Sequence, residues 1–219
     1  MDLEFFNTYD ELIGCDEVGR GPIAGPVNGC AVKITKLNSG LINFLESLGV
    51  TDSKKLTTKK RLIILEKLSI DLKNLNIHEE YTIKLSEGEF SFIIGEHSPK
   101  DIDKMNILQA SLSCMKNASE PLIEKKSKIL IDGNKTFVIE NVDIEAIVKG
   151  DSKSTVIALA SIIAKEYRDL LMQKFDIQYP GYGLARHAGY PTKAHKEAVV
   201  NLGVTPIHRK SFKGVKEYV

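Results

Sequence analysis

Short apolar runs alternate along this chain with longer segments in which apolar residues recur at helical spacing. The short runs are bounded by Gly, Asn, Asp and Glu, which is typical of strands. They predict strands at residues 11–16, 27–34, 79–85, 89–96, 129–131 and 143–148. The longer segments predict helices at residues 41–48, 57–68, 100–118, 152–175 and 192–202. Strands that alternate with helices predict an α/β layer fold.

Three of the predicted strands lead into carboxylates. The first ends in Asp16 and Glu17, the run at 129–131 is followed by Asp132, and Asp151 follows the run at 143–148. Acids at strand ends meet at one edge of an α/β sheet. Because neither His nor Cys accompanies them, they predict a site for a hard cation, Mg²⁺ or Mn²⁺. Taken alone, Asp151 is better explained as the N-cap of the next helix.

The adjacent acids Asp16 and Glu17 raise a geometric difficulty. Neighbouring residues of a regular strand point to opposite faces. Both can serve one site only if the strand ends there and the chain turns. The following glycines, Gly19 and Gly21, predict that turn, and with Arg20 between them it allows close approach to a sugar or phosphate.

The composition indicates a soluble globular protein with one sizeable core. The 219 residues are 42% apolar and 27% charged, and no apolar run approaches the roughly 20 residues of a membrane span. The acidic N-terminus does not resemble a secretory signal. Three widely spaced cysteines form no disulfide framework, which favours a reducing cytoplasm. Without a linker or an internal repeat, we expect a single domain over residues 1–219, with residues 176–219 packing beside the site.

The net charge of +1 conceals a strong segregation of charge. Residues 1–19 hold six acids and no Lys or Arg, whereas residues 182–219 hold seven bases against two acids. An acidic centre with a basic flank fits a metal-dependent enzyme that acts on a polyanion, although solvated surface charge explains the segregation equally well. Ser53, Lys54 and Lys55 precede a predicted helix, where cations oppose the helix dipole, so we favour phosphate contact there.

Six stretches resemble the bacterial ribonuclease HII family of the RNase H-like superfamily. In chain order they are residues 14–27 (GCDEVGRGPIAGPV), 52–56 (DSKKL), 132–134 (DGN), 149–151 (KGD), 160–169 (ASIIAKEYRD) and 182–212 (YGLARHAGY to IHRKSF). Each motif is weak evidence alone, but their order and spacing over nearly the whole chain are specific. The resemblance implies an RNase H-like fold with a central mixed five-stranded sheet flanked by helices and a small C-terminal helical segment.

The resemblance also implies a role for individual residues. Asp16, Glu17, Asp132 and Asp151 would bind two Mg²⁺ or Mn²⁺ ions, with Asp16 as the bridge between them. Gly19, Arg20 and Gly21 would sense the ribose 2′-hydroxyl, and Tyr182 would pack against the sugar on the 3′ side. Residues 176–191 form a predicted loop with three tyrosines, Tyr179, Tyr182 and Tyr190. For any one of them, anchoring of this loop is the simpler explanation. Phosphates would be held by Ser53, Lys54, Lys55 and Arg209.

The implied activity is endonucleolytic hydrolysis of the RNA strand of RNA/DNA hybrids. It includes cutting 5′ of ribonucleotides embedded in duplex DNA, leaving 3′-hydroxyl and 5′-phosphate ends, in ribonucleotide and RNA-primer removal. We expect a cytoplasmic monomer without a membrane contact. A sliding clamp is a possible partner, but the sequence contains no recognisable clamp-binding peptide. Ribonuclease HIII is disfavoured because Arg20 is present and only 13 residues precede Gly14. Resolvases and integrases lack these motifs, and a non-catalytic nucleic-acid-binding module has no need of four such acids.

Overall fold

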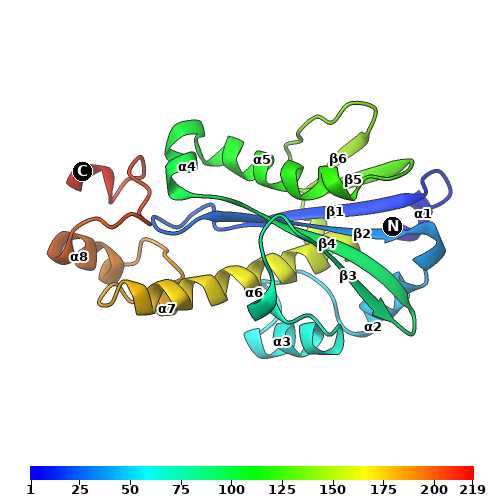
Figure 1. Ribbon diagram of the computed structural model, residues 1–219, viewed down its shortest axis with the longest axis horizontal. Helices are drawn as coiled ribbons and strands as arrows, with labels where there is room; N and C mark the ends of the chain where they lie inside the picture. The colour runs from blue at the N-terminus through cyan, green and yellow to red at the C-terminus, as the bar shows by residue number, and fades with distance from the viewer.

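The computed structural model describes residues 1–219, and its centre is a mixed sheet of six strands (Figure 1). The strands are β1 (Glu11–Val18), β2 (Val27–Thr35), β3 (Glu80–Leu85), β4 (Gly88–His97), β5 (Ser127–Asp132) and β6 (Asp143–Ile147). Their order is β3-β4-β2-β1-β5-β6. The first four in that order pair antiparallel, whereas β5 pairs parallel with both β1 and β6. The carboxyl ends of β1, β5 and β6 therefore meet at one edge of the sheet.

Helices cover both faces of the sheet. They are α1 (Asp2–Phe5), α2 (Leu41–Ser47), α3 (Thr58–Lys67), α4 (Pro99–Met105), α5 (Ile107–Ser119), α6 (Thr155–Gln178), α7 (Leu184–His187) and α8 (Lys193–Leu202). Figure 1 shows α4 and α5 on one face, with α6, α2 and α3 on the other. None of the helices combines the length and the apolarity that crossing a bilayer requires.

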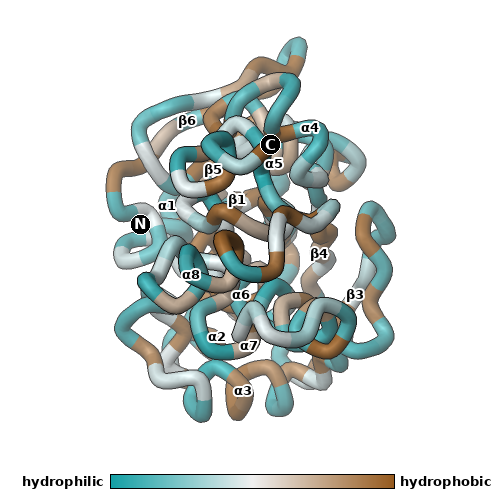
Figure 2. The backbone as a smooth tube through the Cα atoms, turned by 90° about the vertical axis from the view of Figure 1, so that its left-hand side faces the viewer, coloured by the Kyte–Doolittle hydropathy of each residue, from teal (hydrophilic) through white to brown (hydrophobic).

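The alternation of side chains along β1 separates two hydrophobic clusters. Leu12 packs in the cluster that contains the first half of α6, and Ile13 and Cys15 pack in the cluster that contains Met115 of α5. Figure 2 shows a hydrophobic stretch of β1 near the middle of the molecule. Because successive residues alternate, Asp16 shares the α6 face with Leu12, and Glu17 faces α5.

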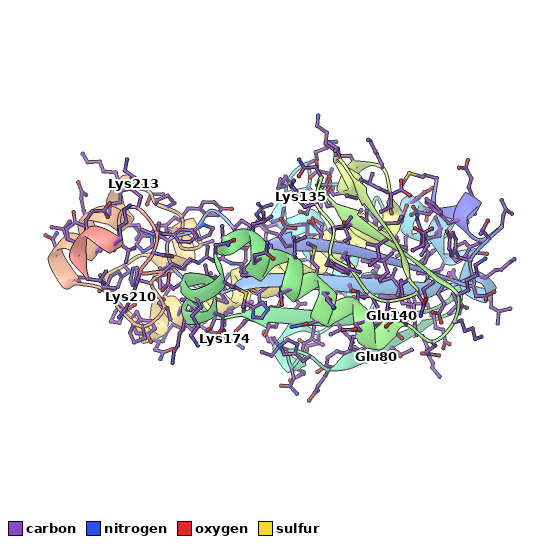
Figure 3. The ribbon with its side chains drawn as sticks, turned by 90° about the horizontal axis from the view of Figure 1, so that it is seen from above. Glu80, Lys135, Glu140, Lys174, Lys210 and Lys213 are labelled. Atoms are coloured by element: carbon purple, nitrogen blue, oxygen red, sulfur yellow. The ribbon has the colours of Figure 1, made fainter.

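The C-terminal segment extends the molecule beyond the end of the sheet. It has a small core of its own against the last turns of α6, built from Ala24, Met172, Tyr182, Leu184, Val199 and Ile207. An isolated bridge between Ala24 and His208 ties this segment to the turn after β1. Figure 3 shows Lys210 and Lys213 at this end of the molecule, far from Glu80 and Glu140.

Most predicted elements are present, with three differences. The sheet has six strands instead of the five that the family resemblance implied; the sixth is β6, the strand predicted at 143–148, which pairs parallel with β5. The helix predicted at 100–118 is two helices, since Asn106 has a φ of 70° and caps α5 through its side chain. Asp151 is not the N-cap of α6; Ser154 is, through a side-chain hydrogen bond to Ile157 N–H.

Candidate active site

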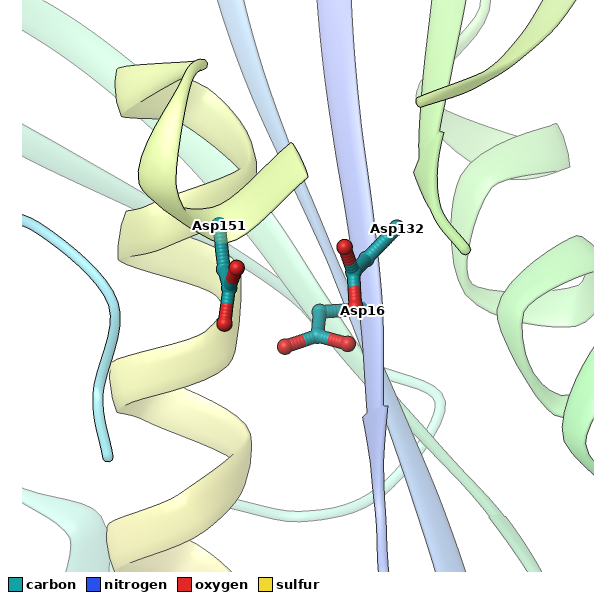
Figure 4. Close-up of side chains that lie close together, drawn as sticks. All are labelled: Asp16, Asp132 and Asp151. Carbon is teal, nitrogen blue, oxygen red and sulfur yellow. The ribbon is translucent and has the colours of Figure 1, made fainter. Parts of the chain in front are cut away.

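Three carboxylates from distant parts of the chain meet on the α6 face of the sheet. Asp16 lies on β1, Asp132 ends β5, and Asp151 lies in a 3₁₀ turn, Gly150–Ser152, just before α6. Each offers an oxygen, and these oxygens lie within 4.8 Å of one another (Figure 4). Two backbone N–H groups hold the cluster in place, from Gly150 to Asp132 at 2.6 Å and from Glu17 to Asp16 at 2.7 Å.

Glu17 stands apart from this three-carboxylate cluster. β1 continues through Val18, so the strand does not end at the acids as expected, and Glu17 points toward α5. It forms a salt bridge of 3.1 Å with Arg20. Glu17 and Arg20 also line a small pocket of about 50 Å³, together with Asp132 and residues of α5. Glu17 thus approaches Asp132 from the opposite side of β1.

The buried carboxylates destabilise one another as anions. Burial, then the charges of Glu17 and Asp132, raise the pKa of Asp16 well above its usual range. Burial and the charges of Asp132 and Asp52 likewise raise the pKa of Asp151. A hydroxyl hydrogen bond from Ser161 acts in the other direction on the pKa of Asp16. Such a group of acids is a stable set of anions only beside a cation.

Lys54 is a cation that the chain itself supplies to the cluster. Burial alone lowers the pKa of Lys54, but the charges of Asp16, Asp151 and Asp132 together raise it above its ordinary value. Asp52 fixes this segment, because its carboxylate accepts hydrogen bonds from Lys54 N–H at 2.9 Å and from Ser152 Oγ at 3.3 Å. The ammonium group of Lys54 therefore lies in the field of the acids.

The other two candidates of this segment differ in exposure. Ser53 is 3% exposed and its hydroxyl bonds to Ser161 Oγ at 2.9 Å, so it braces α6 and is turned away from solvent. Lys55 is exposed, and its ammonium group donates to Ser152 Oγ at 3.0 Å. Only Lys54 and Lys55 of this group present side chains to the surface.

Arg209 lies in the interior of the protein and not at the surface, where it was expected to bind a phosphate. It is fully buried, and its guanidinium donates to the carbonyls of Gly19 (2.5 Å), Arg20 (3.0 Å), Gly25 (2.9 Å) and Pro26 (3.0 Å). Burial and the neighbouring Arg168 lower the pKa of Arg209 to about 9. A phosphate outside the protein cannot reach this group, which instead holds the Gly-Arg-Gly turn from within.

Arg168 of α6 holds the same turn from its other side. It is 1% exposed and donates to the carbonyls of Pro26, Ala24 and Ala188. Gly19, with a φ of 93°, packs against it, and a Cβ at Gly19 would collide with its Nε. The turn therefore requires glycine at position 19 for its backbone angle and for its close packing.

Tyr182 is mostly inside the C-terminal core. Its ring is 6% exposed, its hydroxyl donates to the Gly203 carbonyl at 2.7 Å, and it packs against His195 and His208. These contacts are those of a loop anchor; contact with a sugar stays a prediction. Tyr190 is the exposed ring of this loop, at 46%, and a Cβ at Gly21 would lie 3.1 Å from it.

Sequence reasoning missed Arg168, Asp52 and Tyr190. Arg168 lies next to Tyr167 on the long apolar helix, and an arginine among core positions is a signal for a buried cation. Asp52 directly precedes the Ser-Lys-Lys stretch and was within the matched motif. Nothing in the sequence separates the three tyrosines of residues 179–190, because their exposure depends on tertiary packing.

Comparison with known proteins gives a consistent result. The sequence profile described as ribonuclease HII matches residues 13–215. Ribonuclease HII of Vibrio vulnificus is 42% identical over 215 residues, which cover 98% of this chain and 92% of the relative. Ribonuclease HII of Desulfotalea psychrophila is 44% identical over 215 residues, covering 96% and 84%.

Solved structures share the fold. Ribonuclease H2 from Pyrococcus horikoshii aligns with a TM-score of 0.68 at 25% identity, covering 94% of this chain and 96% of the other. The RNase HII from Archaeoglobus fulgidus, solved in complex with PCNA, aligns with a TM-score of 0.69 at 22% identity, covering 92% and 95%. Bst-RNase HIII in complex with Mn²⁺ aligns with a TM-score of 0.56 at 16% identity, covering 97% and 70%. With its RNase H-like fold and its full-length similarity to these relatives, the chain belongs to the ribonuclease HII family of endoribonucleases.

Proposed function

We propose that this protein hydrolyses the RNA strand of RNA/DNA hybrids and cuts duplex DNA on the 5′ side of an embedded ribonucleotide. The products are 3′-hydroxyl and 5′-phosphate ends. The observation that carries the proposal is the meeting of Asp16, Asp132 and Asp151 beside a rigidly held Gly-Arg-Gly turn. The three-carboxylate cluster suits phosphodiester chemistry, and the Gly-Arg-Gly turn suits recognition of the sugar. The two lie next to each other, because the turn directly follows β1, which carries Asp16.

We propose that the three-carboxylate cluster, together with Glu17, binds two divalent metal ions, Mg²⁺ or Mn²⁺. Its donors are all oxygen, and the charge of Asp132 raises the pKa of both Asp16 and Asp151. Asp16, Asp132 and Asp151 would hold these ions, with Glu17 as a fourth ligand from the other face of β1. Two such ions would stabilise the attacking and the leaving oxygens of an in-line displacement at phosphorus.

Glu17 and Lys54 set the charge around that cluster. Burial raises the pKa of Glu17 above its ordinary value, and the salt bridge to Arg20 offsets only part of that rise. If Glu17 bound a metal ion, Arg20, whose side chain is 51% exposed, would be free to contact the substrate at the surface. Lys54 and Lys55 then lie where a phosphate of the cleaved strand passes.

The Gly-Arg-Gly turn and the loop after α6 would determine specificity. A backbone that reads the 2′-hydroxyl distinguishes RNA from DNA without a base contact. Gly19, Arg20 and Gly21 provide that backbone, and Tyr182 packs behind the sugar on the 3′ side. The basic C-terminal end, which includes Lys210 and Lys213, would follow the backbone of the flanking duplex (Figure 3).

We propose a monomer that works in a reducing cytoplasm, in removal of ribonucleotides and RNA primers from DNA. All three cysteines are free and buried, in keeping with such a compartment. The Archaeoglobus fulgidus relative was solved with PCNA, so a sliding clamp is a candidate partner for this chain as well.

The experiment is cleavage of a labelled DNA duplex that contains one ribonucleotide, with product ends mapped at nucleotide resolution. The proposal expects a single cut 5′ of the ribonucleotide, only with Mg²⁺ or Mn²⁺, and no cut in the all-deoxy duplex. A protein that shifts the duplex in a gel but leaves it intact in both metals would instead be a binding module.

A further inference from the structure

Arg168 and Arg209 are two buried guanidinium groups whose hydrogen bonds all go to backbone carbonyls. Together they reach the carbonyls of Gly19, Arg20, Ala24, Gly25, Pro26 and Ala188. Neither forms a salt bridge with a carboxylate. Burial brings the pKa of Arg168 to about 10, and burial together with the charge of Arg168 lowers the pKa of Arg209 to about 9. Placing two cations side by side in a core is costly, so the arrangement calls for a reason beyond packing.

The carbonyls bound by Arg209 determine where the facing amides point. Every peptide bond of the chain is trans, and in a trans peptide the C=O and N–H groups point in opposite directions. The Gly19 and Arg20 carbonyls point inward to Arg209. The N–H groups of Arg20 and Gly21, which belong to the same two peptide units, must therefore point outward.

Those two N–H groups have no acceptor within the chain. Neither nitrogen donates in any backbone or side-chain hydrogen bond, and both residues are exposed. Consecutive free amides of this kind form a concave donor surface for an oxygen acceptor. They lie on the surface directly after the acids of β1, next to the exposed ring of Tyr190.

We infer that Arg209 is a positioning residue for ribose recognition: by binding the Gly19 and Arg20 carbonyls it turns the Arg20 and Gly21 amides toward the substrate sugar. The inference rests on the proposed function and adds to it a residue that never touches substrate. It requires the planar fork of arginine, because donors in two directions must reach Gly19 and Gly25 on different sides. Lysine, with the same charge, cannot span these carbonyls.

The test is the preference of the protein for a ribonucleotide, measured as binding. Dissociation constants are determined in EDTA for a DNA duplex with one uridine and for the same duplex with deoxyuridine. We expect Arg209→Lys to reduce the wild-type preference by about tenfold, the equivalent of one or two weakened hydrogen bonds. The matched control, Lys210→Met, removes the neighbouring cation at the surface and should weaken binding to both duplexes by the same factor.

A second measurement does not depend on how the variant folds. In the wild-type protein, the amide resonances of Arg20 and Gly21 should shift more with the uridine duplex than with the deoxyuridine duplex. Equal shifts would overturn the inference, as would an unchanged preference in a folded Arg209→Lys protein. If the wild type cleaves 5′ of the ribonucleotide while these results are negative, the positioning role alone fails; if it does not cleave there, the proposed function fails.

Discussion

Gly14 of β1 and Ile157 of α6 meet backbone to backbone. A Cβ at Gly14 would lie 2.5 Å from the Ile157 nitrogen and equally close to the Val156 carbonyl carbon. This contact brings the start of α6 directly onto the strand that carries Asp16, and the turn before α6 carries Asp151. The distance between the carboxylates of Asp16 and Asp151 therefore depends on Gly14, which has no side chain.

Replacing Gly14 with alanine should force β1 and α6 apart. Neither neighbour is a flexible side chain, so we expect Gly14→Ala to lower the free energy of unfolding by about 1–3 kcal/mol, the usual effect of overpacking. Cleavage should fall further than stability explains, because Asp16 and Asp151 separate. Denaturant unfolding and cleavage rates measure both. Gly40→Ala is the control, since nothing lies within 4 Å of that position, and wild-type behaviour of Gly14→Ala would refute the contact's importance.

The Ser161 hydroxyl should control the pH range of activity. Its hydrogen bond lowers the pKa of Asp16 against the stronger effects of burial and Glu17. Without it the carboxyl is protonated at higher pH, so in Ser161→Ala the acid limb of the pH–rate profile should move to higher pH and more Mn²⁺ should be needed. Ser53→Ala is the comparison, because Ser53 bonds to Ser161; equal shifts in the two variants would argue against a direct effect.

A chain of neutral histidines should make the C-terminal segment sensitive to acid. His208 Nδ1 accepts from Thr205 N–H, His208 Nε2 lies 3.2 Å from His195 Nε2, and His195 Nδ1 lies 2.9 Å from the Tyr190 carbonyl. These contacts require the imidazole rings of both His195 and His208 to be neutral. Burial and the adjacent His195 lower the pKa of His208 from 6.5 to about 4.

Between those two pH values the unfolded chain binds a proton that the folded chain does not. The free energy of unfolding should therefore fall as the pH drops from 6.5 toward 4, and be insensitive to His208 above 6.5. Urea unfolding at about pH 7.5 and about pH 5 measures this, and His208→Asn should flatten the dependence. His78 is exposed, so His78→Asn should leave it unchanged. A pH dependence that survives in His208→Asn would assign it to another group.

Asn106 should be more important for stability than its exposed neighbours. It has a φ of 70° and a ψ of 162°, and its side chain accepts from Leu108 N–H and Gln109 N–H. Asn106→Ala loses the cap and strains the backbone, so we expect a loss of about 2–3 kcal/mol. Asn106→Gly loses the cap but relieves the backbone, and should cost less. Thermal unfolding of the two variants measures both losses of stability. A larger loss for Asn106→Gly than for Asn106→Ala would contradict this explanation.

Local patterns were sufficient for much of the fold. Thr57, the first residue of the helix predicted at 57–68, is the N-cap of α3, and Gly203, which follows the helix predicted at 192–202, ends α8. The break at Asn106 was missed because the apolar stripe continues across it in nearly the same phase. Periodicity reports which face is buried and is insensitive to one residue with a positive φ.

The site was predictable where chemistry is local and not where it depends on tertiary packing. The period of two along β1 and β5 brings Asp16 and Asp132 to one face, which the acids at strand ends had indicated. The same period sends Glu17 to the other face, against expectation. In the sequence, Arg209 cannot be distinguished from the other basic residues of the C-terminal end. The carbonyls that its guanidinium binds belong to residues distant in the sequence, so the residues beside it do not indicate this contact.

The central claim is that Asp16, Asp132 and Asp151 form one metal-dependent catalytic centre. The most direct test is single-turnover cleavage of a duplex with one embedded ribonucleotide by Asp16→Asn, with binding measured in EDTA on the same preparation. We predict that cleavage is lost in both Mg²⁺ and Mn²⁺, while affinity for the duplex is kept or increased because a buried negative charge is removed. Turnover at the wild-type rate in a variant that binds the duplex normally would contradict the claim.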